Sequence, residues 1–225
     1  MTIRGQKSSR AFTLVELLIG AALSATVMVA VLSSYIYLGR QLGRLAHQQT
    51  LETQARLAIG QLTRDVQTAS GLTTITTSPT SPAANRLDLI VPTATGTTEL
   101  VTYYYNADLT DAATITINGT SVTMPAASLT RCVYNGTTVI SRTLVRYITD
   151  GDTAEDDNDL QFRYYDASGN EYITATLTAA SYLSGIKQVS LEYSAQVVTV
   201  NQGTTTPVQR EASSRLTLRN RGFLQ

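Results

Sequence analysis

The sequence predicts an α+β protein in which one long N-terminal helix packs on an antiparallel β-sheet head. Two observations lead to this prediction. Residues 17–38 form an apolar, charge-free run that continues into an amphipathic helical pattern, and from Leu72 onward short strand-like runs alternate with turn residues. The chain has 225 residues, which is enough for one sizeable globular domain beside the helix.

The apolar run has the length and composition of a membrane-spanning helix. At 1.5 Å per residue, residues 17–38 span about 33 Å, which is enough to cross a bilayer. Arg4, Lys7 and Arg10 precede the run, and positive residues favour the cytoplasmic side of a membrane. Tyr35 and Tyr37 stand at the other end, where aromatic residues commonly mark the membrane interface. The sequence therefore predicts a single-pass anchor, but Arg40 and Arg44 follow the run and weaken the charge asymmetry that would place its N-terminus in the cytoplasm.

Glu16 lies at the start of this apolar run and is its most informative residue. A carboxylate in a membrane-length helix costs roughly 2.5–3.5 kcal/mol even on the lenient insertion scale. Such groups usually serve a function and have a partner that offsets the cost. A plain membrane anchor has no need of this residue, so we expect Glu16 to take part in assembly or binding.

The helix is expected to continue beyond the membrane as an amphipathic segment over residues 39–71. Apolar residues recur at spacings of three and four, which places them on one face of a helix. These are Leu51, Ala55, Ala58, Leu62, Val66 and Ala69. Polar residues, among them Asp65, fill the positions between them, and Gly71 is expected to end the helix. The whole helix would then have roughly 55–60 residues.

The remaining residues, 72–225, are predicted to form a β-rich head. Expected strands are Arg86–Val91, Thr98–Asn106, Ala113–Ile117, Ser121–Met124, Arg131–Tyr134, Thr138–Ile148, Leu160–Tyr165, Glu171–Leu177, Gly185–Val200 and Pro207–Asn220. Asn118-Gly119 and Asn135-Gly136 predict two-residue hairpin turns. The strands are expected to form one antiparallel sheet domain that packs on the amphipathic half of the helix.

One acidic segment in the head is a candidate cation site. Six of the ten residues from 150 to 159 are carboxylates: Asp150, Asp152, Glu155, Asp156, Asp157 and Asp159. Calcium prefers oxygen-rich loops of this kind, but the spacing does not match an EF-hand. A solvated acidic loop is the favoured interpretation and a calcium site is the alternative. No other cofactor is predicted.

Composition and motifs argue against catalysis and against direct binding of nucleic acid. The net charge is zero, so the chain has no global basic field. His47, the single histidine, is predicted on the helix surface, and the single cysteine, Cys132, is expected to be a half-buried strand residue. The sequence has no phosphate-binding glycine loop, no Cys/His metal spacing and no serine-elbow pattern. We therefore predict a structural protein rather than an enzyme.

The N-terminal residues Ala11-Phe12-Thr13-Leu14-Val15-Glu16-Leu17 resemble the cleavage and methylation motif of type IV prepilins. The resemblance implies that residues 1–11 are a leader, that cleavage occurs between Ala11 and Phe12, and that the new Phe12 amine is methylated. The family usually has glycine where this chain has Ala11. It also implies a mature transmembrane helix over residues 12–38 and a pilin-like fold.

Residues 55–67 also resemble the matching segment of PilW-type minor pilins and GspJ-type pseudopilins. This resemblance implies a minor subunit of a type IV pilus, with a pseudopilin of type II secretion as the alternative. The implied partners are prepilin peptidase, other pilin or pseudopilin subunits, the membrane and an inner-membrane assembly platform. The implied location is the bacterial inner membrane with an extracytoplasmic head, and then the filament.

The resemblance gives Glu16 a specific role, in which its carboxylate neutralises the Phe12 amine of a neighbouring subunit during assembly. A buried ion pair of this kind provides register and specificity more than stability. Two less favoured alternatives are a tip adhesin, whose head binds a ligand, and a membrane-anchored enzyme with a chance motif.

Overall fold

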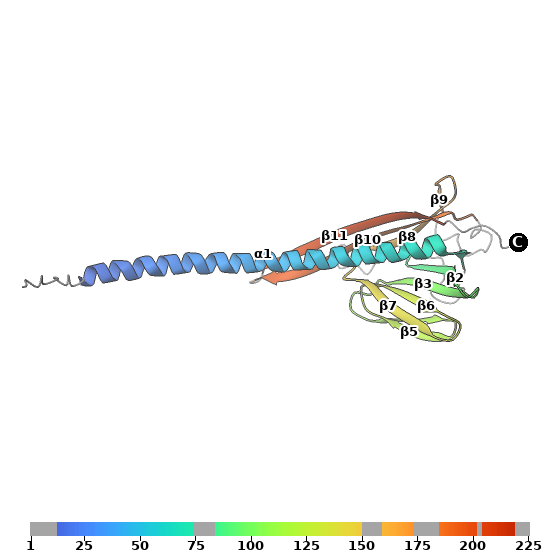
Figure 1. The fold of residues 1–225 in the computed structure, drawn as a ribbon, viewed down its shortest axis with the longest axis horizontal. Coiled ribbons are helices and arrows are strands. Elements are labelled where there is room, and N and C mark those ends of the chain that lie inside the picture. The colour runs from blue at the N-terminus through green and yellow to red at the C-terminus, as the bar shows by residue number, and fades with distance from the viewer. Residues whose placement is uncertain (1–12, 74–83, 150–158, 173–184, 202–203, 219–225) are drawn as a thin grey trace, which may run out of the picture. The chain divides into compact units, whose positions relative to one another are not determined.

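The computed structural model describes residues 13–73, 84–149, 159–172, 185–201 and 204–218 (Figure 1). By its contacts the chain divides into two units, Met1–Leu45 and Ala46–Gln225. Helix α1, Leu14–Thr68, begins in the first unit and ends in the second. Its 55 residues agree with the predicted length, but it ends three residues before Gly71, which instead begins the first strand.

The head contains antiparallel strands in the order that the sequence predicts, with one addition. The strands are β1 Gly71–Leu72, β2 Arg86–Pro92, β3 Thr98–Asn106, β4 Ala113–Ile117, β5 Thr120–Met124, β6 Ser128–Tyr134, β7 Val139–Arg146, β8 Leu160–Tyr165, β9 Glu171–Tyr172, β10 Gln188–Asn201 and β11 Thr204–Thr217. β1 was not predicted, because two residues are too few to show an alternating pattern.

The predicted α+β fold, a long helix with antiparallel β structure, is confirmed, and the described strands form three sheets. A five-stranded sheet has the order β1-β2-β3-β6-β7, a four-stranded sheet has the order β11-β10-β8-β9, and β4 pairs only with β5. The two larger sheets share one apolar core with the helix. From the helix it includes Leu51, Ala58 and Leu62, from β2 Leu87, and from β10 Leu191. Hydrophobic periodicity marked the faces of these strands but not the sheet to which each strand belongs.

Asp65 fixes the amphipathic half of α1 on the five-stranded sheet. Its carboxylate accepts a hydrogen bond from the Tyr103 hydroxyl at 2.6 Å and from Arg131 Nε at 2.6 Å. Burial of the Arg131 guanidinium opposes its charge, but hydrogen bonding and attraction from Asp65 outweigh this effect and raise its pKa. Asp65 is 4% exposed, so its expected place on the polar face of the helix is wrong. Its charge is buried because it is paired and hydrogen-bonded.

A second, smaller core lies between the β4–β5 hairpin and the five-stranded sheet. It contains Ile115, Ile117, Met124 and Cys132. Cys132 is fully buried rather than half-buried, and desolvation raises the pKa of its thiol to about 12. The cysteine is therefore a packing residue.

A buried ion pair lies on the face of the five-stranded sheet that carries Cys132. Asp88, Thr102 and Cys132 are direct neighbours across β2, β3 and β6. The Arg86 Nε–Asp88 Oδ2 distance is 2.7 Å, and both side chains are fully buried. The Thr102 hydroxyl also donates to the Asp88 carboxylate. The sheet therefore holds two opposite charges in its interior within a hydrogen-bonded network.

The turns follow the predictions in part. Asn118 and Gly119 have φ values of 45° and 81°, which fits the predicted two-residue hairpin turn. Asn135-Gly136 does not form such a turn. Four residues, 135–138, connect β6 to β7, and the Asn135 side chain accepts hydrogen bonds from the backbone N–H groups of Thr137 and Thr138. The side chain of Asn135 therefore organises a longer loop.

The expected strand Thr138–Ile148 ends at Arg146, and the residues after it join the two large sheets. The Gln196 N–H donates to the Tyr147 carbonyl at 2.8 Å, and the Thr149 N–H donates to the Ser194 carbonyl at 3.1 Å. Tyr147 has a φ of 62°, which is unusual for a bulky residue. This local bend ends β7 and turns the chain toward β10.

Candidate processing and assembly site

The start of α1 is closed by a capping box made of Thr13 and Glu16. The backbone N–H and the hydroxyl of Thr13 both donate to Glu16 Oε2 at 3.0 Å. In return, the Glu16 N–H donates to Thr13 Oγ1 at 3.3 Å. These bonds satisfy N–H groups that have no partner inside the helix. The Thr-x-x-Glu spacing is visible in the sequence, but the role predicted for Glu16 rested on its charge alone.

Glu16 therefore has a local partner before it meets any other chain. Its carboxylate lies in the first turn of the helix, between apolar side chains that are exposed in the isolated chain, such as Leu14 and Leu17. Ala11 and Phe12, the predicted processing residues, lie outside the described residues. The pairing of Glu16 with the Phe12 amine of a neighbour stays a prediction.

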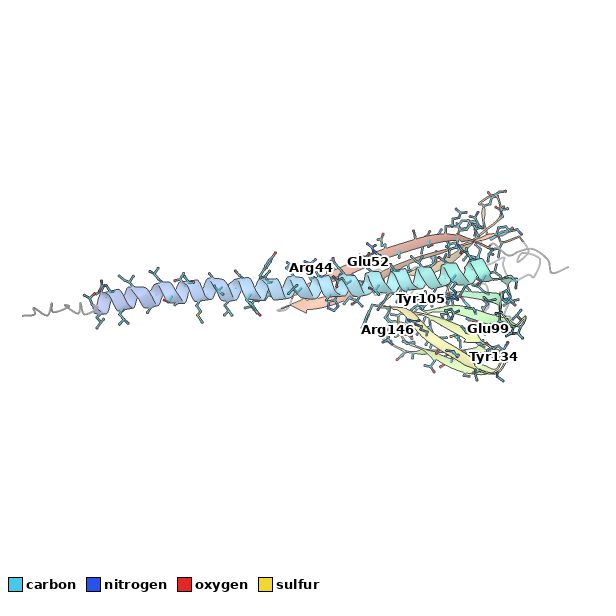
Figure 2. The ribbon with its side chains drawn as sticks, viewed as in Figure 1. Arg44, Glu52, Glu99, Tyr105, Tyr134 and Arg146 are labelled. Carbon is cyan, nitrogen blue, oxygen red and sulfur yellow. The ribbon has the colours of Figure 1, made fainter. Side chains whose placement is uncertain are left out.

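The first unit exposes apolar side chains along the described part of its helix (Figure 2). By its length and composition, α1 is long and apolar enough to cross a membrane. Three of its hydroxyl groups are satisfied within the helix, because Ser24, Thr26 and Ser34 each donate to the carbonyl four residues earlier. Such internal satisfaction is what a lipid environment requires.

The acidic segment is mostly outside the described residues, which include only Asp159 of its six carboxylates. Asp159 is 2% exposed and accepts a hydrogen bond from the Tyr105 hydroxyl at 3.2 Å. Within the described ranges, no group of three or more His, Cys, Asp or Glu residues has the arrangement of a metal site. Calcium binding by Asp150–Asp157 stays an untested alternative to a solvated loop.

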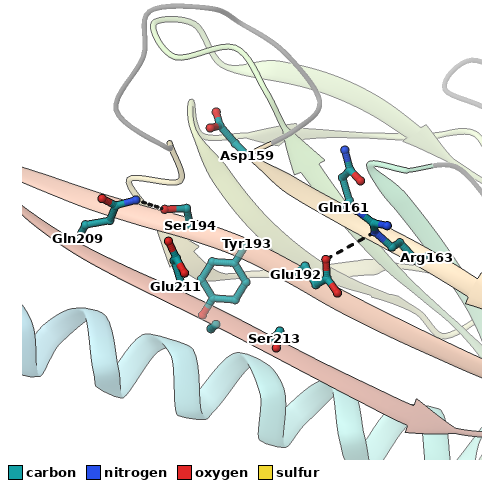
Figure 3. A pocket seen from close by; sticks show the side chains of 10 residues that line it. Asp159, Gln161, Arg163, Glu192, Tyr193, Ser194, Gln209, Glu211 and Ser213 are labelled. Atoms are coloured by element: carbon teal, nitrogen blue, oxygen red, sulfur yellow. Dashed lines mark hydrogen bonds and ion pairs between the residues drawn. The ribbon is translucent and has the colours of Figure 1, made fainter.

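The four-stranded sheet has a polar hollow of about 650 Å³ on its outer face (Figure 3). Arg163 Nε lies 3.5 Å from Glu192 Oε2, and Gln209 Nε2 donates to Ser194 Oγ at 2.9 Å. Polar side chains on the outer face of an antiparallel sheet are the ordinary arrangement. The contacts are internal pairs, and they do not resemble a nucleophile with its base. His47, the only histidine, is exposed on α1.

Comparison with known proteins bears on the N-terminal segment. A family model described as the prokaryotic N-terminal methylation motif matches residues 6–32. Neither the curated proteins nor the solved structures contain a match to this chain. The matched residues include the predicted cleavage position, the capping box and most of the apolar run.

This match agrees with the geometry at the start of α1. The apolar helix and the motif together support membrane anchoring. The motif implies a substrate of prepilin peptidase that assembles with other pilins, and it indicates a structural subunit rather than an enzyme. The N-terminal methylation motif thus supports a type IV pilin-like protein, which is a prepilin-like pilin or pseudopilin subunit.

Proposed function

We propose that the protein is a minor pilin that takes part in assembly of a type IV pilus. In this proposal prepilin peptidase removes residues 1–11 and methylates the Phe12 amine. Before assembly, the mature helix resides in the inner membrane with the head outside the cytoplasm. The observation that supports the proposal most directly is Glu16, a carboxylate in the first turn of an apolar helix within the methylation motif.

The proposed assembly step exchanges the partner of Glu16. In the isolated chain its carboxylate accepts two hydrogen bonds from Thr13. When the subunit enters a filament, the carboxylate meets the Phe12 amine of its neighbour, and the attraction is strong because both groups have left water. The capping box holds the Glu16 carboxylate beside Thr13 until the amine of the neighbouring subunit replaces Thr13 as its partner.

Substitution of Glu16 tests this step. Glu16→Ala is expected to leave membrane insertion and leader removal intact, because the apolar run becomes more apolar. It should reduce incorporation into filaments by at least about tenfold, the effect of losing roughly 1.4 kcal/mol of pairing. Immunoblots of membrane and sheared-filament fractions would measure both quantities. The control is Asp111→Ala, which removes an exposed carboxylate of the head that lies outside the groove described below. Normal incorporation of Glu16→Ala would exclude the pairing.

A clean deletion distinguishes the two machines that use such subunits. Lost surface pili and twitching with normal secretion would support a type IV pilus. Lost secretion with normal pili would make the protein a pseudopilin of type II secretion. If both were normal, leader processing would separate a dispensable tip adhesin, which is cleaved, from an anchored protein that is not.

A further inference from the structure

The second unit has an open groove between α1 and strand β11. Two adjoining hollows of about 480 and 250 Å³ share Glu52 and Arg210, so they form one continuous groove. Its helix side runs from Gln48 to Gly60, and its strand side runs from Val208 to Ser213. Figure 3 shows β11 as the strand nearest the helix, with β10 on its other side.

β11 offers an unpaired edge along this groove. It is the last strand of its sheet and pairs with β10 over its full length from Thr204 to Thr217. Among the described residues, no strand pairs with its second edge. The outer edge of β7, the last strand of the five-stranded sheet, differs because one of its backbone groups is paired. The Gln54 side chain of α1 accepts a hydrogen bond from the Arg146 N–H at 3.1 Å. An open edge beside a helix is the arrangement that binds an extended peptide as an added strand.

The floor of the groove is made of small or apolar residues. Ala55, Ile59 and Gly60 contribute from α1, and Ala212 contributes from β11. A Cβ atom added to Gly60 would meet no atom within 4 Å. The groove therefore has room for side chains of an added strand, which would point alternately toward and away from its floor.

The rim of the groove has a positive balance. Arg56 pairs with Glu52 at 2.6 Å, and Arg210 also attracts Glu52. Glu211 also lines the wider of the two hollows, but it follows Arg210 in the strand, so its side chain points to the opposite face of the sheet, where it lines the polar hollow (Figure 3). Two guanidinium groups thus share one carboxylate, so an occupant with its own carboxylate would complement the rim.

We propose that this groove binds an extended segment of a partner protein. The segment adds a strand to the open edge of β11 and places small apolar side chains over Ala55 and Gly60. Its carboxylate lies between Arg56 and Arg210. The proposal concerns the head alone and stands whether or not the leader is cleaved.

The test uses the full chain in detergent micelles and an arrayed library of nonapeptides. Each peptide alternates Thr with Ala, Val, Leu or Ile and carries one central Asp. Fluorescence anisotropy would measure affinity, and hydrogen exchange would report protection of Val208–Ser213. The library is expected to contain binders that slow exchange in these residues. Replacing the peptide Asp with Lys should weaken binding by at least about tenfold, because it places a positive charge beside Arg56 and Arg210. N-methylation of the alternate amides that face β11 should weaken binding by a similar factor, since each lost hydrogen bond is worth about 1 kcal/mol.

The protein variants are a matched pair of helical glycines. Gly60→Leu adds a side chain to the groove, its Cβ meets no atom within 4 Å, and it is expected to weaken binding by at least about tenfold. Gly43→Leu is the control, because its added Cβ also meets nothing within 4 Å and it lies outside the groove. It should change affinity by less than about twofold, since surface substitutions away from a site have little effect.

Three results would overturn the proposal. A library without a binder would show that the edge accepts no such strand. Binding that survives Gly60→Leu or N-methylation would place the peptides elsewhere. Dimers of the protein seen by light scattering, and dissociated by Gly60→Leu, would identify a second copy of this chain as the occupant in place of a different partner.

Discussion

Single hydroxyl groups show how strictly the head pairs its buried polar atoms. The Tyr103 hydroxyl donates to Asp65, and the Tyr164 hydroxyl donates to the Arg86 carbonyl at 2.9 Å. The Tyr193 hydroxyl is an exception, because it is buried without a hydrogen-bond partner among the described residues. Burial raises the pKa of Tyr193 to about 12, so the hydroxyl stays protonated at any physiological pH.

Removal of the hydroxyl group should therefore change the free energy of unfolding differently at Tyr103 and at Tyr193. Tyr103→Phe is expected to lower the free energy of unfolding by about 1.5–3 kcal/mol, because it removes a hydrogen bond to a charged group. Tyr193→Phe should leave it unchanged or raise it by up to about 1 kcal/mol, because it removes an unsatisfied buried group. Urea denaturation measures both. Equal losses in the two variants would contradict this assignment.

Cys132 should be unreactive in the folded protein and should reduce stability in strong alkali. Its pKa of about 12 lies above the ordinary value of 9.0, so the folded state disfavours the thiolate. The resulting stabilisation is complete below about pH 9 and is lost as the pH rises toward 12. N-ethylmaleimide at pH 8 should modify the thiol only after unfolding in urea, with glutathione as the freely reacting control. Rapid modification of the native protein would contradict a buried thiol.

At the scale of elements, α1 shows what helical periodicity can and cannot predict. The stripe Leu51, Ala55, Ala58, Leu62 and Val66 is buried as predicted. Asp65 lies beside it and was assigned to the polar face. Its partners Tyr103 and Arg131 are 38 and 66 positions away in the sequence, and no local pattern pairs residues over such distances. Glu16 differs, because its capping box is formed within four consecutive residues, and a local sequence pattern can therefore indicate it.

Truncation of two leucines of α1, Leu62 and Leu57, should lower the free energy of unfolding by very different amounts. Leu62→Ala is expected to cost about 2–5 kcal/mol of the free energy of unfolding, because Leu62 is fully buried in the main core. Leu57→Ala should cost less than about 0.5 kcal/mol, because Leu57 is 51% exposed. Chemical denaturation of both variants would measure the difference. A similar cost for both would show that the helix does not pack on the head through the stripe.

The strands were predicted well where side chains alternate and poorly where long-range pairing decides. β3, β4 and β8 have the predicted bounds, and β8 buries Leu160, Phe162 and Tyr164 in strict alternation. The division of the strands among three sheets was not predictable, because the same alternation fits any sheet with one buried face. β7 is shorter than predicted because Tyr147 adopts a left-handed backbone conformation, which few bulky residues do.

At the scale of the whole molecule, the chain consists of an exposed apolar helix and a head with its own core. Every residue of the main core lies between Leu51 and Leu218, inside the second unit. The part of the first unit that the structure describes, residues 13–45, contributes no residue to it. The head should therefore not need the apolar helix in order to fold.

A fragment that comprises residues 46–225 is expected to fold by itself. Because it retains the complete core, it should unfold in one cooperative transition, with a urea midpoint within about 15% of that of the full chain in detergent. Circular dichroism would follow both. Loss of cooperativity in the fragment would mean that the first unit is needed for the head to fold.

The buried pair of Arg86 and Asp88 limits how this sequence can change over evolutionary time. Loss of the Arg86 charge would leave the Asp88 carboxylate in the interior without its ion-pair partner, at a cost of about 3–5 kcal/mol. Joint replacement by apolar side chains of similar volume is often nearly neutral. The two positions are only two residues apart in one strand, so a single recombination event can exchange both. We therefore expect related heads to keep this pair intact or to lack both members, with few intermediates.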